Sequence, residues 1–345
     1  MSKLFICALL LFSLVIPVHA AQFAPPEVPE SGTDLMPDTE NFGDGLQEMI
    51  LSGLEQIHPY LSEACRTAFS IITAVMAVSL LKTFSDPVSN MAIFAGCTAV
   101  AVLMMQNAGS MIQLGQATVV EISEYGKLLL PVMTAALASQ GGVTSSAALY
   151  TGTAVFTGLL GNLISKVFLP MVYLFLALAT GAAALENAGM RQLRDLSKNF
   201  VSWCLKTLLI LFTTYMSITG VVSGTTDAAV LKTTKVTISS VVPVVGGILS
   251  DASEAVLVSA GLMKNAAGIY GIFAVLAVFL LPFLRVGVQY LLLKFTAAVC
   301  SIFAPKSITE LIGDFSTAMG LLLAMTGSVC LLQLISTVCF MKGAG

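Results

Sequence analysis

The feature that most constrains this chain is its scarcity of charged side chains. Only 10% of its 345 residues are Asp, Glu, Lys or Arg, and 57% are hydrophobic. Soluble domains contain about 25% charged and roughly 45–50% apolar residues. A water-soluble fold of this length would lack the charge to cover its surface, whereas lipid solvates apolar side chains directly. The composition therefore predicts an all-α, polytopic integral membrane protein, packed through small residues such as its 28 glycines.

The first twenty residues have the pattern of a secretory signal peptide. Lys3 supplies the positive charge, Leu4 to Ile16 form an apolar run, and Pro17 breaks this run shortly before Ala20. The run is shorter than the roughly 20 residues that cross a bilayer. We expect cleavage after Ala20, and the alternative is an uncleaved signal anchor. In either case the segment that follows leaves the cytoplasm.

Residues 21–63 form the one ordinarily polar part of the chain. Prolines and acidic side chains dominate its first half, which disfavours a helix there. The stretch from Leu46 to Leu61 is amphipathic. We expect an extracytoplasmic acidic leader followed by a helix at the membrane surface, because basic residues are depleted on that side of the membrane.

Long apolar segments follow the leader to the end of the chain. Residues 64–112 predict two transmembrane helices, residues 113–222 a first membrane repeat unit and residues 223–345 a second. At about 20 residues per span, roughly seven to ten crossings accommodate these segments. The loop around Arg194 is the most basic in the chain and should face the cytoplasm.

The two repeat units are suggested by pairs of prolines at a constant offset. Pro131 and Pro170 are 39 residues apart, as are Pro243 and Pro282, and the second pair follows the first by 112 residues. Duplicated membrane units with interruptions at matching positions are typical of translocation paths. The alternative is a chance similarity between two apolar regions, and the sequence leaves both readings open.

Two interrupted segments, near Pro131 to Ser146 and near Pro243 to Glu254, carry polar and small residues within apolar sequence. Irregular backbone and ionisable groups at membrane depth must face protein or water. We therefore expect both segments to face a lumen or a partner helix. The residues predicted to do so are Pro131, Ser145, Ser146, Pro243, Asp251, Glu254, Lys264 and Asn265.

A second feature in the first unit is a pair of carboxylates. Glu121 and Glu124 are three positions apart and would share one helical face. They either line an aqueous path or lie at the water interface.

The inventory of catalytic residues is small. The chain has two histidines, His19 and His58, and the first lies in the predicted signal peptide. Ser-His-Asp, Cys-His and HExxH arrangements are therefore nearly excluded, and the sequence contains neither a P-loop nor GxGxxG. It also lacks CxxC pairs and the basic stripe of a nucleic-acid-binding protein. We expect a protein that is not an enzyme, with no cofactor, no metal and no nucleic-acid partner.

Several stretches resemble the stage III sporulation protein AE family. Pro243 to Gly246 and Lys264 to Gly271 match the family pattern in order and spacing, and Gly142 to Ala148 resembles its first proline block. The resemblance runs from about residue 115 to 340. Residues 21–63 are shorter than the corresponding leader of that family.

The resemblance implies a membrane-embedded component of the sporulation channel complex that links mother cell and forespore. In that family the mother cell makes the protein, which enters the membrane around the engulfed forespore. Its implied partners are other membrane proteins of the stage III sporulation A operon and a forespore membrane protein across the gap. The assembly is similar to a secretion apparatus. The remaining alternatives are a self-sufficient secondary transporter and a membrane assembly scaffold. The small residues of the chain also leave a homo-oligomer open.

One prediction follows from the two acidic residues of the second interrupted segment. If Asp251 and Glu254 face a lumen, replacing both with Ala should impair sporulation without preventing membrane insertion. Spore yield and membrane fractionation of the double variant measure the two effects separately. Normal sporulation in the double variant would refute a lumen role for these carboxylates.

Overall fold

The computed structural model describes residues 24–38, 41–84, 89–241 and 246–342, without the side chains of 81–84, 89–90, 92, 220–241 and 246–263. Every regular element within these ranges is helical, so the predicted all-α class is confirmed. The predicted signal peptide and Pro243 lie outside the described residues.

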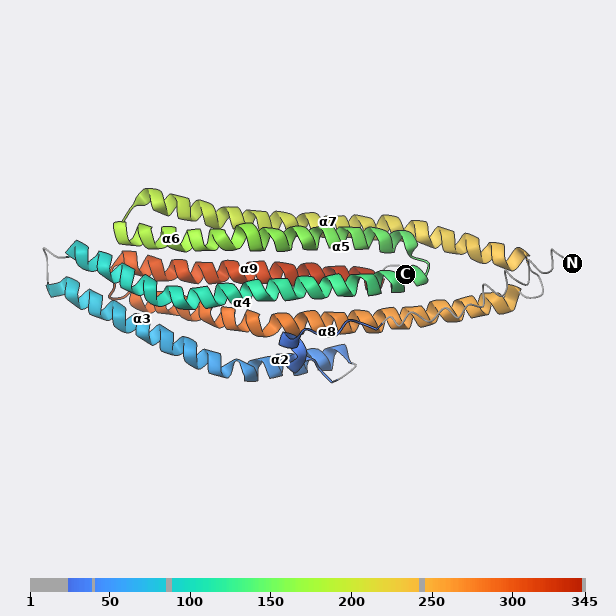
Figure 1. Cartoon of the computed structure of the whole chain (residues 1–345), viewed down its shortest axis with the longest axis horizontal. Coiled ribbons are helices and arrows are strands. Elements are labelled where there is room, and N and C mark those ends of the chain that lie inside the picture. Colours follow the sequence, from blue (N-terminus) through green and yellow to red (C-terminus); the bar gives the residue numbers. More distant parts are fainter. Residues whose placement is uncertain (1–23, 39–40, 85–88, 242–245, 343–345) are drawn as a thin grey trace.

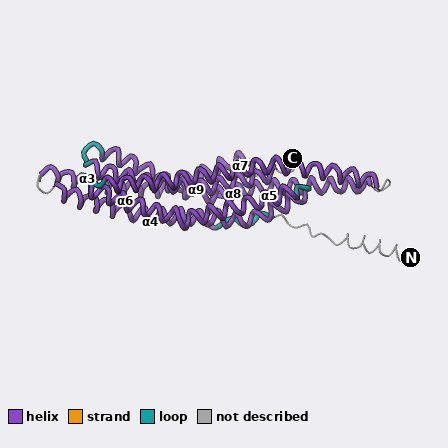
Figure 2. Tube along the Cα trace, turned by 90° about the horizontal axis from the view of Figure 1, so that it is seen from above, coloured by secondary structure: helices purple, strands orange, loops and turns teal. Residues whose placement is uncertain are grey.

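The elements are η1 (Glu30–Leu35), α2 (Phe42–Gln56), α3 (His58–Phe84), α4 (Ser89–Ser139), α5 (Val143–Leu163), η3 (Ile164–Phe168), α6 (Leu169–Leu185), α7 (Ala188–Val241), α8 (Gly246–Cys300) and α9 (Lys306–Lys342). They form an elongated bundle of nearly parallel rods, which two perpendicular views show (Figures 1 and 2). The longest, α4, α7 and α8, have 51 to 55 residues. Such helices are about 75–85 Å long, so the bundle extends well beyond a hydrocarbon layer of roughly 30 Å.

Six helices among the described residues are long and apolar enough to cross a membrane. This number is below the seven to ten crossings expected from the sequence. The difference arises because residues 147–185, which are long enough for two passes of about 20 residues, belong to one candidate span of 43 residues, Val143–Leu185. Apolar length therefore overstates the number of crossings when the helices are longer than the bilayer is thick.

The first predicted interruption is a hairpin connection between two helices. α4 continues through Pro131 to Ser139, and Gln140 to Gly142 then lead into α5. Gly141 has a φ of 91°, a left-handed conformation that glycine adopts without a steric penalty. The amide of Gly142 donates to the carbonyl of Leu137 at 3.1 Å and closes the end of α4.

The second predicted interruption falls at the start of α8. This helix begins at Gly246 and continues without a break to Cys300. Figure 1 shows the distal ends of α7 and α8 extending past the α4–α5 turn and the end of α9. The stretch around residue 254 is therefore helical and belongs to this projecting arm, and its predicted lumen-facing role stays a prediction.

The predicted unit boundaries lie inside continuous helices. Residues 112 and 113 are both in α4, and residues 222 and 223 are both in α7. The prolines also differ in setting, since Pro170 begins α6 whereas Pro282 lies inside α8. Because Pro170 has no N–H for the carbonyl four residues earlier, the preceding turn widens to the π-helical η3. The internal duplication stays a prediction.

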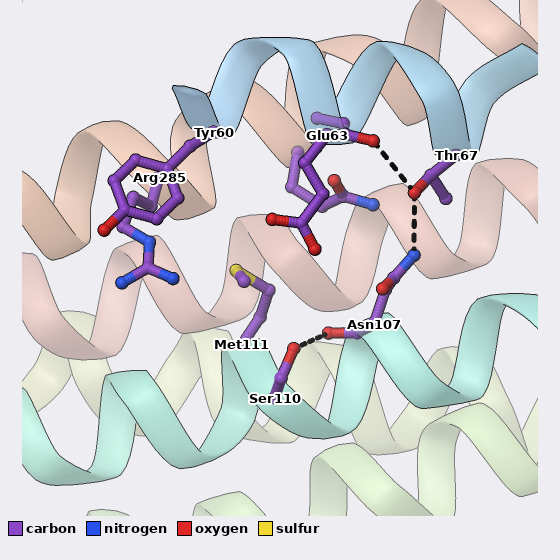
Figure 3. A pocket seen from close by; sticks show the side chains of 9 residues that line it. Tyr60, Glu63, Thr67, Asn107, Ser110, Met111 and Arg285 are labelled. Atoms are coloured by element: carbon purple, nitrogen blue, oxygen red, sulfur yellow. Dashed lines mark hydrogen bonds between the residues drawn. The ribbon is translucent and has the colours of Figure 1, made fainter. Parts of the chain in front are cut away.

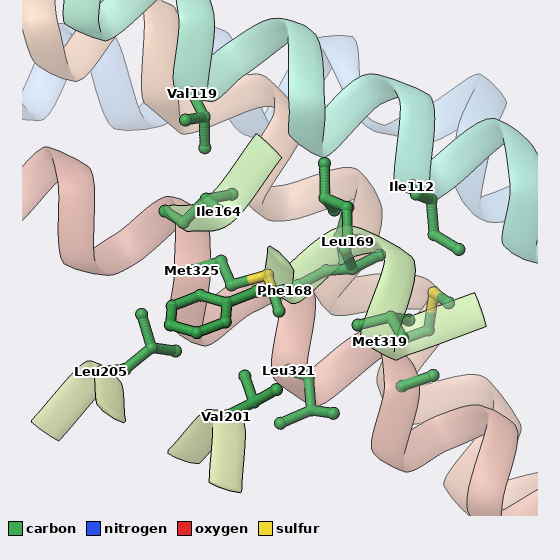
Figure 4. Close-up of a cluster of buried hydrophobic side chains, with 14 of the residues drawn as sticks. Ile112, Val119, Ile164, Phe168, Leu169, Val201, Leu205, Met319, Leu321 and Met325 are labelled. Carbon is green, nitrogen blue, oxygen red and sulfur yellow. The ribbon is translucent and has the colours of Figure 1, made fainter. Parts of the chain in front are cut away.

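α9 is the central helix of the bundle. It packs against α4, α5, α6, α7 and α8. Of the most apolar stretch of α9, 61% is buried inside the bundle, compared with 11% for α3. Around Phe168 of η3, side chains from α4, α7 and α9 close a continuous apolar core (Figure 4). This core consists of interdigitated aliphatic and aromatic groups, which in a membrane stabilise helix association through close packing.

The leader is docked on the bundle. Leu35 of η1 and Met49 of α2 are buried against Phe273 and Ala277 of α8. Gly32 permits this approach, because an added Cβ there would lie 3.0 Å from Val278. The predicted surface helix over 46–61 is divided at Ile57 into α2 and the start of α3.

Ion pairs join the basic loop to α9. Arg194 Nη1 lies 2.6 Å from Asp314 Oδ2, and both side chains are only 14% exposed. Arg191 lies 3.5 Å from Glu310. At the same end, Glu186 has a φ of 51° and accepts a hydrogen bond from Ser307 at 2.6 Å. These contacts fix the α6–α7 turn onto the first turns of α9.

The contact between α5 and α7 yields a stability prediction. An added Cβ at Gly152 would overlap the ring of Tyr215, whose hydroxyl donates to the carbonyl of Ala148. We expect Gly152→Ala to lower the free energy of unfolding by about 1–3 kcal/mol through overpacking. Thermal unfolding of the purified protein in detergent measures this effect.

Gly158 on the same helix provides the matched control. Nothing lies within 4 Å of an added Cβ there, so Gly158→Ala should keep or slightly raise stability, as expected for an unhindered helical glycine. Equal melting temperatures for the two variants would contradict close packing of α5 on α7.

Candidate functional site

A polar groove with a volume of about 170 Å³ lies between α4 and α5. Its α4 wall includes Ser123, Glu124 and Lys127, and its α5 wall includes Thr157 and Asn162. The α5 positions are near the midpoint of the candidate span Val143–Leu185, and the α4 positions lie within the candidate span Ile93–Ser139. Polar side chains at such a position are costly in contact with lipid.

Helical periodicity explains why the polar groups gather here. Ser123 and Lys127 are four positions apart on α4, Thr157 and Gly161 have the same spacing on α5, and Ser165 follows four positions later in η3. Side chains at this spacing share one helical face. The small residues bring the walls together, since an added Cβ at Gly161 would lie 3.5 Å from Ser123 Oγ. The groove is thus a stripe of polar and small residues shared by two helices.

Two hydroxyl groups of the groove lack a partner. The oxygens of Ser123 and Thr157 are buried and make no hydrogen bond within the part of the chain that the structure describes. The residues are only 8% and 4% exposed. A buried polar group without a hydrogen bond costs about 1–3 kcal/mol. These hydroxyls therefore point to a partner supplied from outside the chain, either water or another polypeptide.

The interior beside the groove is also polar. Thr153 of α5 is hydrogen-bonded to Ser336 of α9, and Gln333 packs against Gly126 of α4. The Tyr125 hydroxyl, like Gln333 Oε1, has no hydrogen-bond partner among the described residues. Polar groups therefore continue from the groove toward the central helix.

The structure separates the two glutamates expected to act together. Glu124 lines the groove, whereas Glu121 accepts a hydrogen bond from Ser31 of the leader. The leader thus binds one side of α4 and leaves the groove side open. The two carboxylates therefore have different surroundings: Glu121 contacts the leader, and Glu124 lines the groove.

The residues predicted from the interrupted segments lie elsewhere. Pro131 is exposed on α4. Ser145 and Ser146 are buried at the start of α5, where Ser146 donates to the carbonyl of Val143 at 2.9 Å. Lys264 is buried on α8 and Asn265 is exposed. None of these five lines the groove.

For Asp251 and Glu254 the structure describes the backbone alone, as part of α8. Their role, like that of the other predicted residues, stays a prediction. Within the described ranges, no group of three or more His, Cys, Asp or Glu side chains is placed to hold a metal ion.

Thr153 and Thr157 allow a direct test of the partner argument. Thr153→Val leaves the Ser336 hydroxyl buried and unpaired, so we expect a loss of about 1–3 kcal/mol in the free energy of unfolding. Thr157→Val removes a hydroxyl that has no partner among the described residues and should leave stability unchanged or raise it. Thermal unfolding of both variants measures the difference, and equal destabilisation would mean that Thr157 is satisfied within the bundle.

Comparison with known proteins identifies a family for this chain. The family model described as stage III sporulation protein AE matches residues 40–344. A curated relative, stage III sporulation protein AE of Bacillus subtilis (strain 168), is 28% identical over 171 residues. This alignment covers 50% of the chain and 43% of the relative. No solved structure matches. Since the family model spans most of the chain, this multi-pass membrane protein belongs to the stage III sporulation protein AE family.

Proposed function

We propose that the protein is a membrane-embedded, non-enzymatic component of a sporulation channel complex that links mother cell and forespore. Membership of the family supports a role in sporulation. The six apolar helices support a place within a membrane. The finer role, as part of a conduit, is carried by the groove between α4 and α5.

The groove supports this role because it presents polar groups on the outside of the bundle. Glu124, Lys127 and Asn162 are exposed, and two buried hydroxyls beside them lack partners within the described chain. A protein surrounded by lipid would be destabilised by such a face at mid-span. A subunit of a conduit would turn it toward a lumen or a neighbouring subunit.

The distribution of charge suggests an orientation for this subunit. Arg191, Arg194 and Lys306 lie near the α6–α7 and α8–α9 connections, which share one end of the bundle (Figure 1). Basic residues near the ends of spans favour the cytoplasmic side. We place this end in the mother-cell cytoplasm and the projecting α7–α8 arm in the space facing the forespore.

This arrangement fits the partners implied for the family. The groove would meet other membrane proteins of the stage III sporulation A operon or a second copy of this chain. The projecting arm would lie nearest to a forespore membrane partner. The protein would act in the mother-cell membrane that surrounds the forespore.

A bulky side chain in the groove tests the proposal. We expect Asn162→Trp to reduce spore yield to near that of a strain lacking the protein, because the indole fills the space meant for water or a partner. Leu159→Trp is the matched control, since Leu159 is 44% exposed on the same helix and is not part of the groove lining. Membrane fractionation shows whether both variants are inserted.

Three outcomes decide between the roles. Loss of sporulation with Asn162→Trp alone supports a lumen- or partner-facing groove. Normal sporulation with Asn162→Trp refutes it. Solute transport by the purified protein alone in liposomes would favour a self-sufficient transporter over a component of a complex.

A further inference from the structure

A second polar cavity, of about 200 Å³, lies between α3, α4 and α8, away from the groove. Tyr60 and Glu63 enter it from α3, Asn107 from α4, and Arg285 and Gln289 from α8 (Figure 3). Its volume is below the roughly 300–1,000 Å³ of pockets for drug-sized ligands. The cavity therefore suits a small polar molecule or a headgroup.

The cavity contains two opposite charges that do not pair with each other. The guanidinium carbon of Arg285 lies 3.8 Å from the centre of the Tyr60 ring, and its Nε is buried without a hydrogen-bond partner among the described residues. Glu63 extends its carboxylate into the same space (Figure 3). No ion pair within the described ranges includes either side chain. Glu63 is exposed, so it is the buried Nε of Arg285 that indicates a missing partner, because a buried polar group without a hydrogen bond is costly.

Neutral groups make one wall of the cavity rigid. Asn107 Nδ2 donates to Thr67 Oγ1 at 3.1 Å, and Thr67 Oγ1 donates to the Glu63 carbonyl at 3.1 Å. This chain of hydrogen bonds joins α3 to α4 beside the Glu63 side chain (Figure 3). Gln289 also lines the cavity and is only 8% exposed. A pre-formed wall lowers the entropic cost of binding.

The cavity lies near the start of the first candidate span. His58 begins both α3 and that span, and Tyr60 and Glu63 are in its first two turns. Tyrosine is enriched where a span meets the headgroup region. On α8, Arg285 lies close to the midpoint of the candidate span Lys264–Cys300, so a lipid headgroup would have to reach the cavity from the side, between the helices.

We propose that this cavity binds a small zwitterion, with an anionic group on Arg285 and a primary ammonium on Glu63. The headgroup of an aminophospholipid and free phosphoethanolamine share this chemistry. An anion alone would leave Glu63 unpaired, and a cation alone would leave Arg285 unpaired. A zwitterion satisfies both charges and leaves the Asn107 and Gln289 amides for its remaining polar atoms. This site is independent of the role proposed for the groove.

Lipid selectivity tests the site. Native mass spectrometry of the delipidated full chain in detergent would follow added phosphatidylethanolamine and phosphatidylglycerol. We expect the ethanolamine lipid to bind roughly tenfold or more tightly, because its ammonium adds a charge-assisted hydrogen bond. Glu63→Gln should make the two lipids equal, and Arg285→Gln should weaken both. Glu55→Gln and Lys294→Gln, outside the cavity lining, should change neither.

A soluble competitor identifies the source of the zwitterion. If phosphoethanolamine displaces the lipid or binds alone, with the same dependence on Glu63 and Arg285, the site also accepts a free molecule. Binding of either form with that dependence supports the proposal. Equal affinity of the unmodified protein for the two lipids, without binding of phosphoethanolamine, overturns it. Arg285→Lys keeps the positive charge and should retain part of the binding, which separates recognition from misfolding.

Discussion

Each polar group at membrane depth needs a partner that lipid does not provide, and this requirement organises the structure. Long helices satisfy their backbones internally. α9, the central helix, satisfies side chains by bonding across the bundle, as Ser336 does to Thr153 and Ser316 does to the Tyr290 carbonyl. At the basic end, Arg194 and Asp314 neutralise each other at 2.6 Å. Where such pairing fails, the exceptions mark the sites that need something from outside the chain.

The sequence predicted the class of fold because composition reflects the solvent around a protein. It did not predict the number of crossings. A hydrophobic run shows that a helix is surrounded by lipid or covered by protein, but it does not show where the membrane ends. The run over 147–185 was long enough for two passes but belongs to one rod. The turn at Gln140 to Gly142 carried a readable signal, since Ser-Gln-Gly-Gly is typical of a helix end. Its meaning, a hairpin instead of a dip, depended on the length of both adjoining helices.

The groove could not be predicted from the sequence, for a different reason. The i, i+4 spacing of Ser123 and Lys127 was visible, but the pairing of α4 with α5 decides whether that face is open or covered. Glu121 shows this most clearly, because the leader reaches it through Ser31, 90 residues earlier in the chain. Contacts of such sequence separation cannot be derived from local periodicity. The prediction was based on interruptions of the apolar sequence and therefore selected Pro131 and Ser146. The unpaired hydroxyls lie farther from the α4–α5 turn on both helices.

The two sites with unpaired groups differ in shape, and shape indicates what completes each of them. The groove lies between two helices and carries exposed charges beside its hydroxyls, so a broad surface such as a neighbouring polypeptide or a water-filled lumen can satisfy it. The cavity at Arg285 is closed on three sides by helices α3, α4 and α8, with a buried Nε that no flat surface can reach. A small molecule with two opposite charges meets that requirement. The same physical rule thus leads to an assembly contact on one face of the bundle and to a ligand on another.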